Sequence, residues 1–347
     1  MTIVPLEPAA AGDDRERVGT GLDFLWLELT NRCNLQCVHC YTESGPHTGG
    51  DDALTTDDYL SVMRQAYELG CRKMQFIGGE PQLHGDFQLL LEASKEIGFE
   101  FVEVFTNLTR LPEETVRFAR REGIRFATSV YSDDPAVHHA ITRNGSSHAR
   151  TVRNLKRLID SDVVTRAAVI AIDQQPAEIV RTKEFLTDLG VPYVRDSEVR
   201  EFGRGEAIVS RRAQLEGLCG HCWKGRLCVA PDGDAYPCVM ARQWPVGNVL
   251  EAPLAEIVRG DALGDIRTTI HDTVWLPKLA AGRTASAHAL EGEDETPYPA
   301  EGEPTPAECP QSCVPDTVTP SCPQSCDPFI AVCDPTEPDP EEETLPS

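Results

Sequence analysis

Three cysteines near the start of the chain have a spacing that suits metal chemistry. Cys33, Cys37 and Cys40 form the pattern C-x3-C-x2-C and directly follow an apolar run at residues 24–29. A closed structural metal site uses four protein ligands. Three thiolates on one short loop can instead bind three irons of a cubane cluster and leave the fourth iron open to a substrate or cosubstrate. A zinc knuckle that takes its fourth ligand from elsewhere is the alternative interpretation.

The composition favours a cytoplasmic protein in which clustered cysteines bind metal. The chain has 347 residues, enough for one large domain or two smaller ones. It has no run of about 18 apolar residues, the length of a membrane span. Residues 1–18 lack the basic and then apolar pattern of a signal peptide. Because thiols stay reduced in the cytoplasm, clustered cysteines there favour metal over disulfides.

The net charge of −24 is concentrated at the C-terminal end of the chain. Residues 285–347 contain 15 acidic side chains and no Lys or Arg, whereas most of the remaining chain has a globular composition. Such an acidic segment is typical of a solvated tail without a packed core. This distribution of charge argues against nucleic acid as a partner.

Strand-like and helix-like patterns alternate after residue 23. The expected strands are residues 24–29, 73–77, 101–105, 125–130, 164–172 and 193–196. The expected helices are residues 57–69, 86–97, 112–122, a segment around 152–159, and 177–189. The first helix is expected to bury Leu60, Met63 and Tyr67, and the last helix to bury Ile179 and Val180.

Six βα units in series predict an α/β fold with a parallel sheet and helices outside it. Right-handed crossovers would curl the series into a partial (β/α)6 TIM-type barrel, although periodicity alone does not distinguish it from an open doubly wound sheet. The motifs favour the barrel, because its chemistry lies where the strands end. The polar groups at these expected strand ends are the cysteine loop, residues 78–80, Asn107, Ser129, Asp173 and Arg204.

The cysteine loop, with His39 before its third cysteine, resembles the signature of the radical S-adenosylmethionine (radical SAM) superfamily. Residues 78–81, Gly-Gly-Glu-Pro, resemble the second motif of that family. The resemblance implies a [4Fe-4S] cluster on Cys33, Cys37 and Cys40, with SAM chelating the open iron. Reduction would then cleave SAM to methionine and a 5′-deoxyadenosyl radical, which abstracts a hydrogen atom from the substrate.

The resemblance also implies a SAM pocket built from several strand ends. Glu80 would bind the SAM ammonium group, Ser129 would face the ribose, and Arg143 would lie near the carboxylate. Ordinary turn, helix-entry or capping roles are the alternatives for these side chains, and for Asn107 a cap of the following helix. The cofactor-binding candidates are Gly78, Gly79, Glu80, Asn107, Ser129, Arg143 and His39; no catalytic side chain is identified.

Two further histidines and a lone cysteine have more ordinary expected roles. His138 and His139 either belong to the SAM pocket or serve packing and capping. Cys71 stands alone beside the second expected strand. A lone cysteine of this kind is most often a small core residue, so Cys71 is expected in the core.

A second group of cysteines follows the predicted barrel. A tight turn at residues 232–234 predicts a hairpin within this group. Four thiolates can close a cluster completely, or hold zinc in a ribbon. The spacing resembles the opening half of the SPASM domain. The second half of that motif, C-x2-C-x5-C-x3-C, is missing between residues 240 and 308. The sequence therefore does not decide whether there are one or two auxiliary clusters. The expected ligands are Cys219, Cys222, Cys228 and Cys238.

The remaining cysteines lie in the acidic tail, where the sequence CPQSC occurs twice. Residues 285–347 also hold 13 of the 26 prolines, which argues against a packed core. Three interpretations of these thiols are open. They are ligands of a second auxiliary cluster, they form a zinc clip, or they belong to a flexible tail in which they are modified or resemble a substrate. They are Cys309, Cys313, Cys322, Cys326 and Cys333.

The predicted organisation has five parts. They are a flexible N-terminus (1–20), a radical SAM partial barrel (21–205), a SPASM-like auxiliary domain (206–260), a connecting segment (261–284) and the tail (285–347).

The resemblance favours action on a ribosomally made peptide, by cross-linking, epimerisation or thioether formation. The implied partners are the peptide, an electron donor such as flavodoxin or ferredoxin, and a separate leader-binding protein, with no nucleic acid or membrane. One alternative is a radical SAM decarboxylase, epimerase or dehydratase of a sugar, nucleoside or other small metabolite. The other is a metal-binding scaffold without catalysis.

Overall fold

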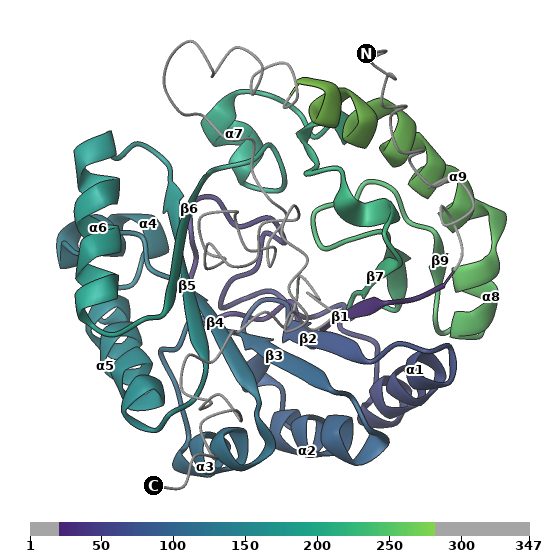
Figure 1. Cartoon of the computed structure of the whole chain (residues 1–347), viewed down its shortest axis with the longest axis horizontal. Coiled ribbons are helices and arrows are strands. Elements are labelled where there is room, and N and C mark those ends of the chain that lie inside the picture. Colours follow the sequence, from purple (N-terminus) through teal and green to yellow (C-terminus); the bar gives the residue numbers. More distant parts are fainter. Residues whose placement is uncertain (1–20, 282–347) are drawn as a thin grey trace, which may run out of the picture. The chain divides into compact units, whose positions relative to one another are not determined.

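The computed structural model describes residues 21–281, and the tail cysteines predicted as possible ligands lie outside that range. Within it, residues 21–278 belong to one compact unit. Its first six strands alternate with helices, as the sequence predicts (Figure 1). These strands are β1 Phe24–Glu28, β2 Lys73–Ile77, β3 Phe101–Phe105, β4 Arg125–Ser129, β5 Thr165–Ala171 and β6 Tyr193–Glu198.

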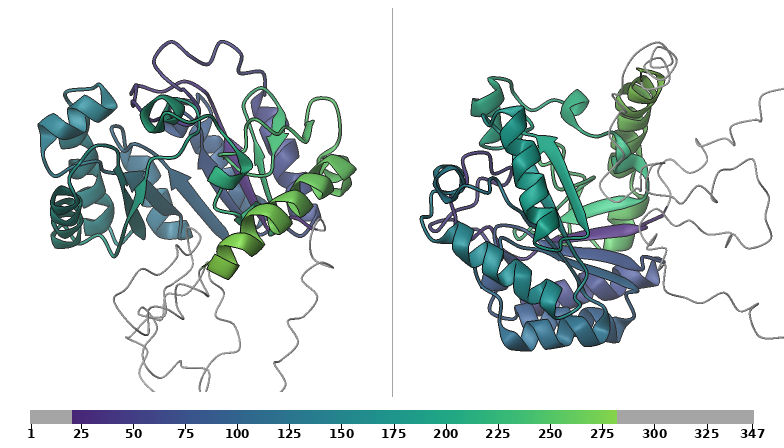
Figure 2. Two further views of the ribbon diagram at one scale, coloured as in Figure 1. Left: turned by 90° about the horizontal axis from the view of Figure 1, so that it is seen from above. Right: turned by 60° about the vertical axis from the view of Figure 1, so that its left-hand side comes forward.

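The helices cover the outer side of this curved sheet, which gives a partial TIM-type barrel (Figures 1 and 2). Five of them match the predicted positions to within a few residues. Helix α4 was not predicted, α8 falls in the predicted auxiliary domain, and α9 falls in the predicted connecting segment. The helices are α1 Thr56–Glu68, α2 Phe87–Ile97, α3 Glu113–Glu122, α4 Pro135–Thr142, α5 Ser147–Asp160, α6 Pro176–Asp188, α7 Gly205–Val209, α8 Leu254–Arg259 and α9 Asp261–Ile270.

The hairpin that carries the second cysteine group continues the barrel sheet. Strand β7 (Arg226–Val229) pairs in parallel with β1, and β8 (Asp234–Tyr236) and β9 (Gly247–Asn248) extend the sheet in antiparallel fashion. The strand order is β6-β5-β4-β3-β2-β1-β7-β8-β9. Strand β1 therefore joins the βα units to the cysteine-rich region, and its Trp26 lies in register with Cys228.

The two faces of the sheet have different chemistry. Leu25 and Leu27 of β1 belong to the main hydrophobic core, in which the sheet packs against the helices. The alternate residues of the strands point to the concave face. There the indole of Trp26 donates to Gln75 Oε1 at 3.0 Å, Gln75 bonds Glu103, and Arg166 forms a two-pronged pair with Glu103 at 2.8 and 2.9 Å. This chain of bonds fixes the concave face from β1 to β5.

The helix α1 buries a different face from the one predicted. Its buried residues are Tyr59, Val62, Met63 and Ala66, whereas Leu60 and Tyr67 are half-buried. The rotation follows from Tyr59, whose hydroxyl donates to the carbonyl of Glu28 at 2.8 Å. This bond needs Tyr59 to face the end of β1.

Helix α6 also departs from the prediction at one position. Ile179 is buried as expected, but Val180 is 55% exposed because Thr182 and Leu186 complete the buried face. The expectation for Cys71 is confirmed: it is fully buried in the core, and its thiol donates to the carbonyl of Lys73 at 3.2 Å.

The last described helices close the cysteine-rich side of the unit. Helix α9 carries Arg267, which is fully buried and donates to the carbonyls of Gly21 and Arg226 at 3.2 and 2.9 Å. The guanidinium thereby ties α9 to β7 and to the segment before β1. Across residues 21–281, the structure has no helix with both the length and the apolar character needed to span a membrane.

Candidate functional site

The cysteine loop lies at the C-terminal end of β1 and is held by the backbones of its neighbours. Its Gln36 and Val38 amides donate to the carbonyls of Thr142 and Ile141 at 3.1 and 3.0 Å. Helix α4, which ends at Thr142, therefore supports the loop directly. This contact explains why a short helix is inserted between β4 and α5.

The glycine pair after β2 packs against the start of the cysteine loop. Gly78 has φ +125°, and a Cβ on Gly79 would lie 2.4 Å from the carbonyl oxygen of Arg32. The amides of Gly79 and Glu80 donate to the carbonyls of Thr30 and Arg32 at 2.7 and 2.9 Å. From the sequence, both glycines are candidates for cofactor binding. In the structure, protein backbone occupies the space beside them.

A second close contact comes from the segment after β6. A Cβ on Gly203 would lie 2.4 Å from the carbonyl oxygen of Tyr41. The next residue, Arg204, donates from Nε to the Cys37 carbonyl at 2.8 Å and from Nη2 to the Ser44 carbonyl at 2.7 Å. The sequence placed Arg204 at this rim without a role. Its role in the structure is to hold the cysteine loop.

Each thiol of the loop has a polar neighbour from the surrounding structure. Asn107 Nδ2 lies 3.7 Å from the Cys33 sulfur, and the Tyr131 hydroxyl lies 4.0 Å from the Cys37 sulfur. The Cys40 sulfur lies 3.2 Å from the hydroxyl of Thr42, within the loop itself. Three different segments therefore supply groups that can donate hydrogen bonds to thiolates.

Burial governs the ionisation of Cys33 and Cys37. It raises the pKa of Cys37 to about 12, and it raises the pKa of Cys33 further still, with the charge of Glu80 as the next cause. A bound metal would reverse this balance, because it binds the thiolate and displaces the proton. The thiols of Cys37 and Cys40 also raise the pKa of Cys33, which places all three in one electrostatic environment.

The donor set of the loop fits an iron-sulfur cluster. Among residues 21–281, no three Cys, His, Asp or Glu side chains are grouped as ligands of a single metal ion. A cubane has a different requirement, since each of three cysteines binds a different iron atom of the cluster. Three thiols on one constrained loop, of which Cys33 is buried and Cys37 and Cys40 are half-buried, meet that requirement.

Glu80 is a buried acceptor directly beside the loop. Its carboxylate accepts from the Thr106 hydroxyl at 2.7 Å, from the Asn107 amide at 2.8 Å and from the Gln82 amide at 3.2 Å. Burial nevertheless raises the pKa of this carboxyl group, although these hydrogen bonds oppose the shift. A ligand cation next to Glu80 would stabilise its charged form.

The side chain of Asn107 bridges the loop and β3. It donates to Asn34 Oδ1 at 2.8 Å, and its own oxygen accepts from the Thr109 amide at 2.9 Å. The suggested capping of the next helix is wrong. Helix α3 has Pro112 at its N-cap and no side-chain cap, because Asn107 lies too far before the helix.

The end of β4 brings together Ser129, Tyr131 and two histidines. The Ser129 hydroxyl interacts with Tyr131. The ring of Tyr131 meets the edge of His39 at 5.0 Å between centroids. His138 is a packing residue, 1% exposed, and its Nδ1 accepts from the Tyr131 amide at 3.4 Å. Burial lowers the pKa of both His39 and His138 to about 4. Both rings are therefore neutral at physiological pH.

Arg143 lies apart from these buried groups. It ends α4 in the left-handed region, with φ 54°, and is exposed. Together with Val38 and Arg204 it lines a pocket of about 580 Å³ beside the cysteine loop.

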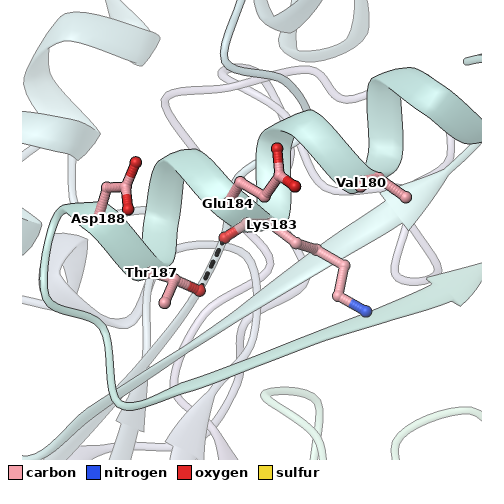
Figure 3. Close-up of a pocket in the computed structure, with 5 residues that line it drawn as sticks. All are labelled: Val180, Lys183, Glu184, Thr187 and Asp188. Carbon is pink, nitrogen blue, oxygen red and sulfur yellow. Dashed lines mark hydrogen bonds between the residues drawn. The ribbon is translucent and has the colours of Figure 1, made fainter.

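A hollow of about 300 Å³ lies elsewhere, on the surface of α6 (Figure 3), and is lined only by Val180, Lys183, Glu184, Thr187 and Asp188. Since all five belong to one helix far from the strand ends, this hollow offers no catalytic arrangement.

The four cysteines of the hairpin region are also close together. The sulfurs of Cys222 and Cys238 lie 3.0 Å apart, and Cys222 also hydrogen-bonds Cys219, which lowers the pKa of Cys219. Cys228 is fully buried on β7, and the charge of Cys238 contributes to raising its pKa. The structure thus brings Cys219, Cys222 and Cys238 into contact, with Cys228 on β7 within electrostatic range of Cys238.

Aromatic side chains surround this cysteine group, which the sequence analysis did not anticipate. The rings of His221 and Trp275 lie 4.3 Å apart, and those of Trp223 and His271 lie 4.7 Å apart. His271 and Trp275 belong to a π-helical turn directly after α9. His271 and Trp275 lie within residues 240–308, where the second half of the SPASM motif is missing. The aromatic rings pack around Cys222 and Cys238.

Two family profiles match the chain. The radical SAM superfamily profile matches residues 27–186, and that of an iron-sulfur cluster-binding domain, SPASM, matches residues 219–276. With the three-cysteine loop at the end of β1, this defines the chain as a radical SAM protein. It is more narrowly a radical SAM protein with a SPASM domain, and the cofactors of these two domains are [4Fe-4S] clusters and SAM.

Two of the curated relatives of the chain are named for different activities. The antilisterial bacteriocin subtilosin biosynthesis protein AlbA of Bacillus subtilis is 25% identical over 257 residues, which cover 64% of this chain and 56% of AlbA. The chain thus matches little more than half the length of AlbA. A probable GTP 3′,8-cyclase of Methanothermobacter thermautotrophicus is also 25% identical, over 65% of this chain and 87% of the cyclase.

Solved structures show the same fold. SuiB of Streptococcus suis, bound to the precursor peptide SuiA, superposes with a TM-score of 0.60 at 16% identity, covering 73% of this chain and 69% of SuiB. The protein anSMEcpe, with bound AdoMet and the Cp18Cys peptide, gives a TM-score of 0.56 at 15% identity, covering 72% of this chain and 83% of anSMEcpe.

We expect Gly79→Ala to loosen the cysteine loop. The new Cβ would clash with the Arg32 carbonyl, so the free energy of unfolding should fall by about 2–4 kcal/mol, the range of severe backbone or packing conflicts. Gly85→Ala is the matched control, since nothing lies within 4 Å of the corresponding Cβ. Denaturant unfolding and iron content after anaerobic reconstitution measure the effect. Equal behaviour of the two variants would contradict the close packing.

We expect His138 to make stability depend on pH. Its pKa is about 4 in the folded chain against 6.5 as the reference value, so the unfolded chain binds more protons between these values. The free energy of unfolding should therefore fall as the pH drops from 6.5 to 4 and stay level above 6.5. His138→Gln should reduce that slope, whereas His139→Gln, at an exposed position, should leave it unchanged. Identical slopes for both variants would refute this role.

Proposed function

We propose that this radical SAM protein modifies a ribosomally synthesised peptide. The observation that carries the proposal is the joining of two cysteine sites by one sheet. Strand β1 leads into the three-cysteine loop, and β7, paired with β1, carries Cys228 of the second group. Trp26 and Cys228 are in register and pack together on the concave side. A substrate within the barrel would therefore lie between the two cysteine sites.

The proposed SAM pocket uses residues that the structure places around the loop. Glu80 offers a buried carboxylate to the ammonium group of SAM, and Ser129 offers a hydroxyl to the ribose at the end of β4. Arg143 is an exposed guanidinium beside the loop that is available for the SAM carboxylate. When bound, the cluster and SAM supply a 5′-deoxyadenosyl radical by reductive cleavage. The protein's own part is to orient SAM and keep water from the loop.

The assignment of a peptide substrate draws on the comparisons. AlbA is a bacteriocin biosynthesis protein, and SuiB has been solved with a precursor peptide. We propose that this chain likewise takes a peptide and receives electrons from a flavodoxin or ferredoxin. Leader recognition would come from a separate protein or from the tail, residues 285–347.

The experiment is anaerobic incubation of the reconstituted protein with SAM, dithionite and the peptide encoded beside its gene. We expect 5′-deoxyadenosine together with a change in the mass or stereochemistry of the peptide. The triple variant of Cys33, Cys37 and Cys40 to Ala should form neither product. If 5′-deoxyadenosine forms while the peptide remains unchanged in mass and stereochemistry, the peptide assignment is wrong.

A small-metabolite substrate is the second candidate. The similarity to probable GTP 3′,8-cyclases, which spans 84–87% of their length, favours this alternative. The same reaction mixture with GTP in place of the peptide tests it. Conversion of GTP at a rate coupled to 5′-deoxyadenosine formation would replace the peptide proposal.

We further propose that Cys219, Cys222, Cys228 and Cys238 hold one closed auxiliary cluster. The wild-type chain should then contain about eight irons, and the Cys33/Cys37/Cys40 triple variant about four. Replacing all five tail cysteines by Ser should leave about eight, because four thiols already close the site. Cys71→Ala is the control for loss of a cysteine that binds no iron. A fall to about four irons in the tail variant would place the tail among the ligands.

A further inference from the structure

A buried carboxylate connects the two cysteine sites. Glu28 is the last residue of β1 and is completely buried. Its Oε1 accepts a hydrogen bond from the Tyr41 hydroxyl at 3.1 Å, and its Oε2 is paired with the guanidinium of Arg242. The motifs of the sequence include none of these three side chains.

The two partners of Glu28 lie next to different cysteine sites. Tyr41 directly follows Cys40, so its side chain extends from the end of the three-cysteine loop. Arg242 comes four residues after Cys238 and lies within the region matched by the SPASM profile. One carboxylate on β1 therefore binds a residue next to a ligand of the first site and a residue close to a ligand of the second.

The surroundings make this bridge strong. The side chain of Arg242 is only 20% exposed, and its guanidinium lies 5.8 Å from the centre of the Tyr236 ring. Inside a protein, hydrogen bonds to charged groups are stronger than in water, and a buried charge that loses its partner is strongly destabilising. The Arg242 guanidinium offsets the buried charge of Glu28, and a hydrogen bond from Tyr41 to a carboxylate is stronger than one to a neutral acceptor.

The loop is also constrained on the other side of Tyr41. Gly203 packs against the Tyr41 carbonyl, and the Arg204 amide donates to the Cys40 carbonyl at 3.0 Å. The segment after β6 thus holds the backbone at the end of the loop. The side chain of Tyr41 is held by Glu28 of β1, which is itself paired with Arg242 of the SPASM region. Loss of the Glu28 contact would remove this hydrogen bond of the Tyr41 side chain while leaving the backbone contacts in place.

We propose that Arg242 is a positioning residue for the SAM-binding loop, supplied by the SPASM region and acting through Glu28 and Tyr41. The proposal rests on the proposed SAM-binding role of the loop. Arg242 does not touch SAM or the reacting atoms. It fixes the carboxylate that orients the residue after Cys40, and in this way the auxiliary region contributes to the geometry of SAM binding.

The test compares Arg242→Met and Tyr41→Phe with Arg259→Met, a control at an exposed arginine of the same region on α8. Each reconstituted holoenzyme is assayed for iron, for SAM affinity by anaerobic equilibrium dialysis, and for the change in the cluster's electron paramagnetic resonance spectrum on adding SAM. We expect wild-type iron content and about 10-fold weaker SAM binding in the first two variants, the lower end of typical effects of outer-shell partners. The control should match the wild type.

The double variant Arg242→Met/Tyr41→Phe distinguishes positioning from general damage. Both changes interrupt one chain of contacts through Glu28, so their effects on SAM affinity should be far from additive. Wild-type SAM affinity and spectrum in an iron-loaded Arg242→Met protein would overturn the proposal. If Arg242→Met does not retain iron, Tyr41→Phe decides by the same criteria, since it removes only one hydroxyl. A wild-type chain that binds no SAM would instead overturn the proposed function.

Discussion

The organisation of the site depends on backbone packed so closely against the cysteine loop that side chains are excluded. At Gly79 and at Gly203 a Cβ atom would lie 2.4 Å from a carbonyl oxygen of the loop region. These contacts come from the segments after β2 and after β6, at the start and at the end of the loop. Hydrogen bonds to α4 add a third support. The loop is therefore shaped by the segments packed around it.

The same architecture explains why two cysteine sites can serve one barrel. On the concave face one chain of hydrogen bonds runs from Trp26 on β1 to Arg166 on β5. Beyond β1, the sheet continues into β7 and its buried Cys228. The Glu28–Arg242 pair then closes this side of the barrel. An auxiliary site built in this way is part of the barrel wall.

Local patterns predicted most of the fold, and both groups of cysteines come together as their spacing indicated. Val180 and the face of α1 were misassigned because single contacts, such as that of Tyr59 with β1, decide the rotation of a helix. The partnership of Glu28 and Arg242 spans 214 residues. Neither residue belongs to a motif, so only the folded chain brings them together. The packing of the glycine pair against the backbone of residues 30–32 joins segments that are distant in the sequence, so only the folded chain shows it.

The pairing of β1 with β7 also determines when the sheet can be completed during synthesis of the chain. Strand β1 is made early, but its partner on one side, Arg226–Val229, follows about 200 residues later. At about 5–20 residues per second, the ribosome needs about 10–40 s to cover that gap. During this interval one edge of β1 has unpaired peptide groups, which are prone to association with other chains. The nascent chain is therefore prone to association at this edge until β7 has been made and can pair with β1.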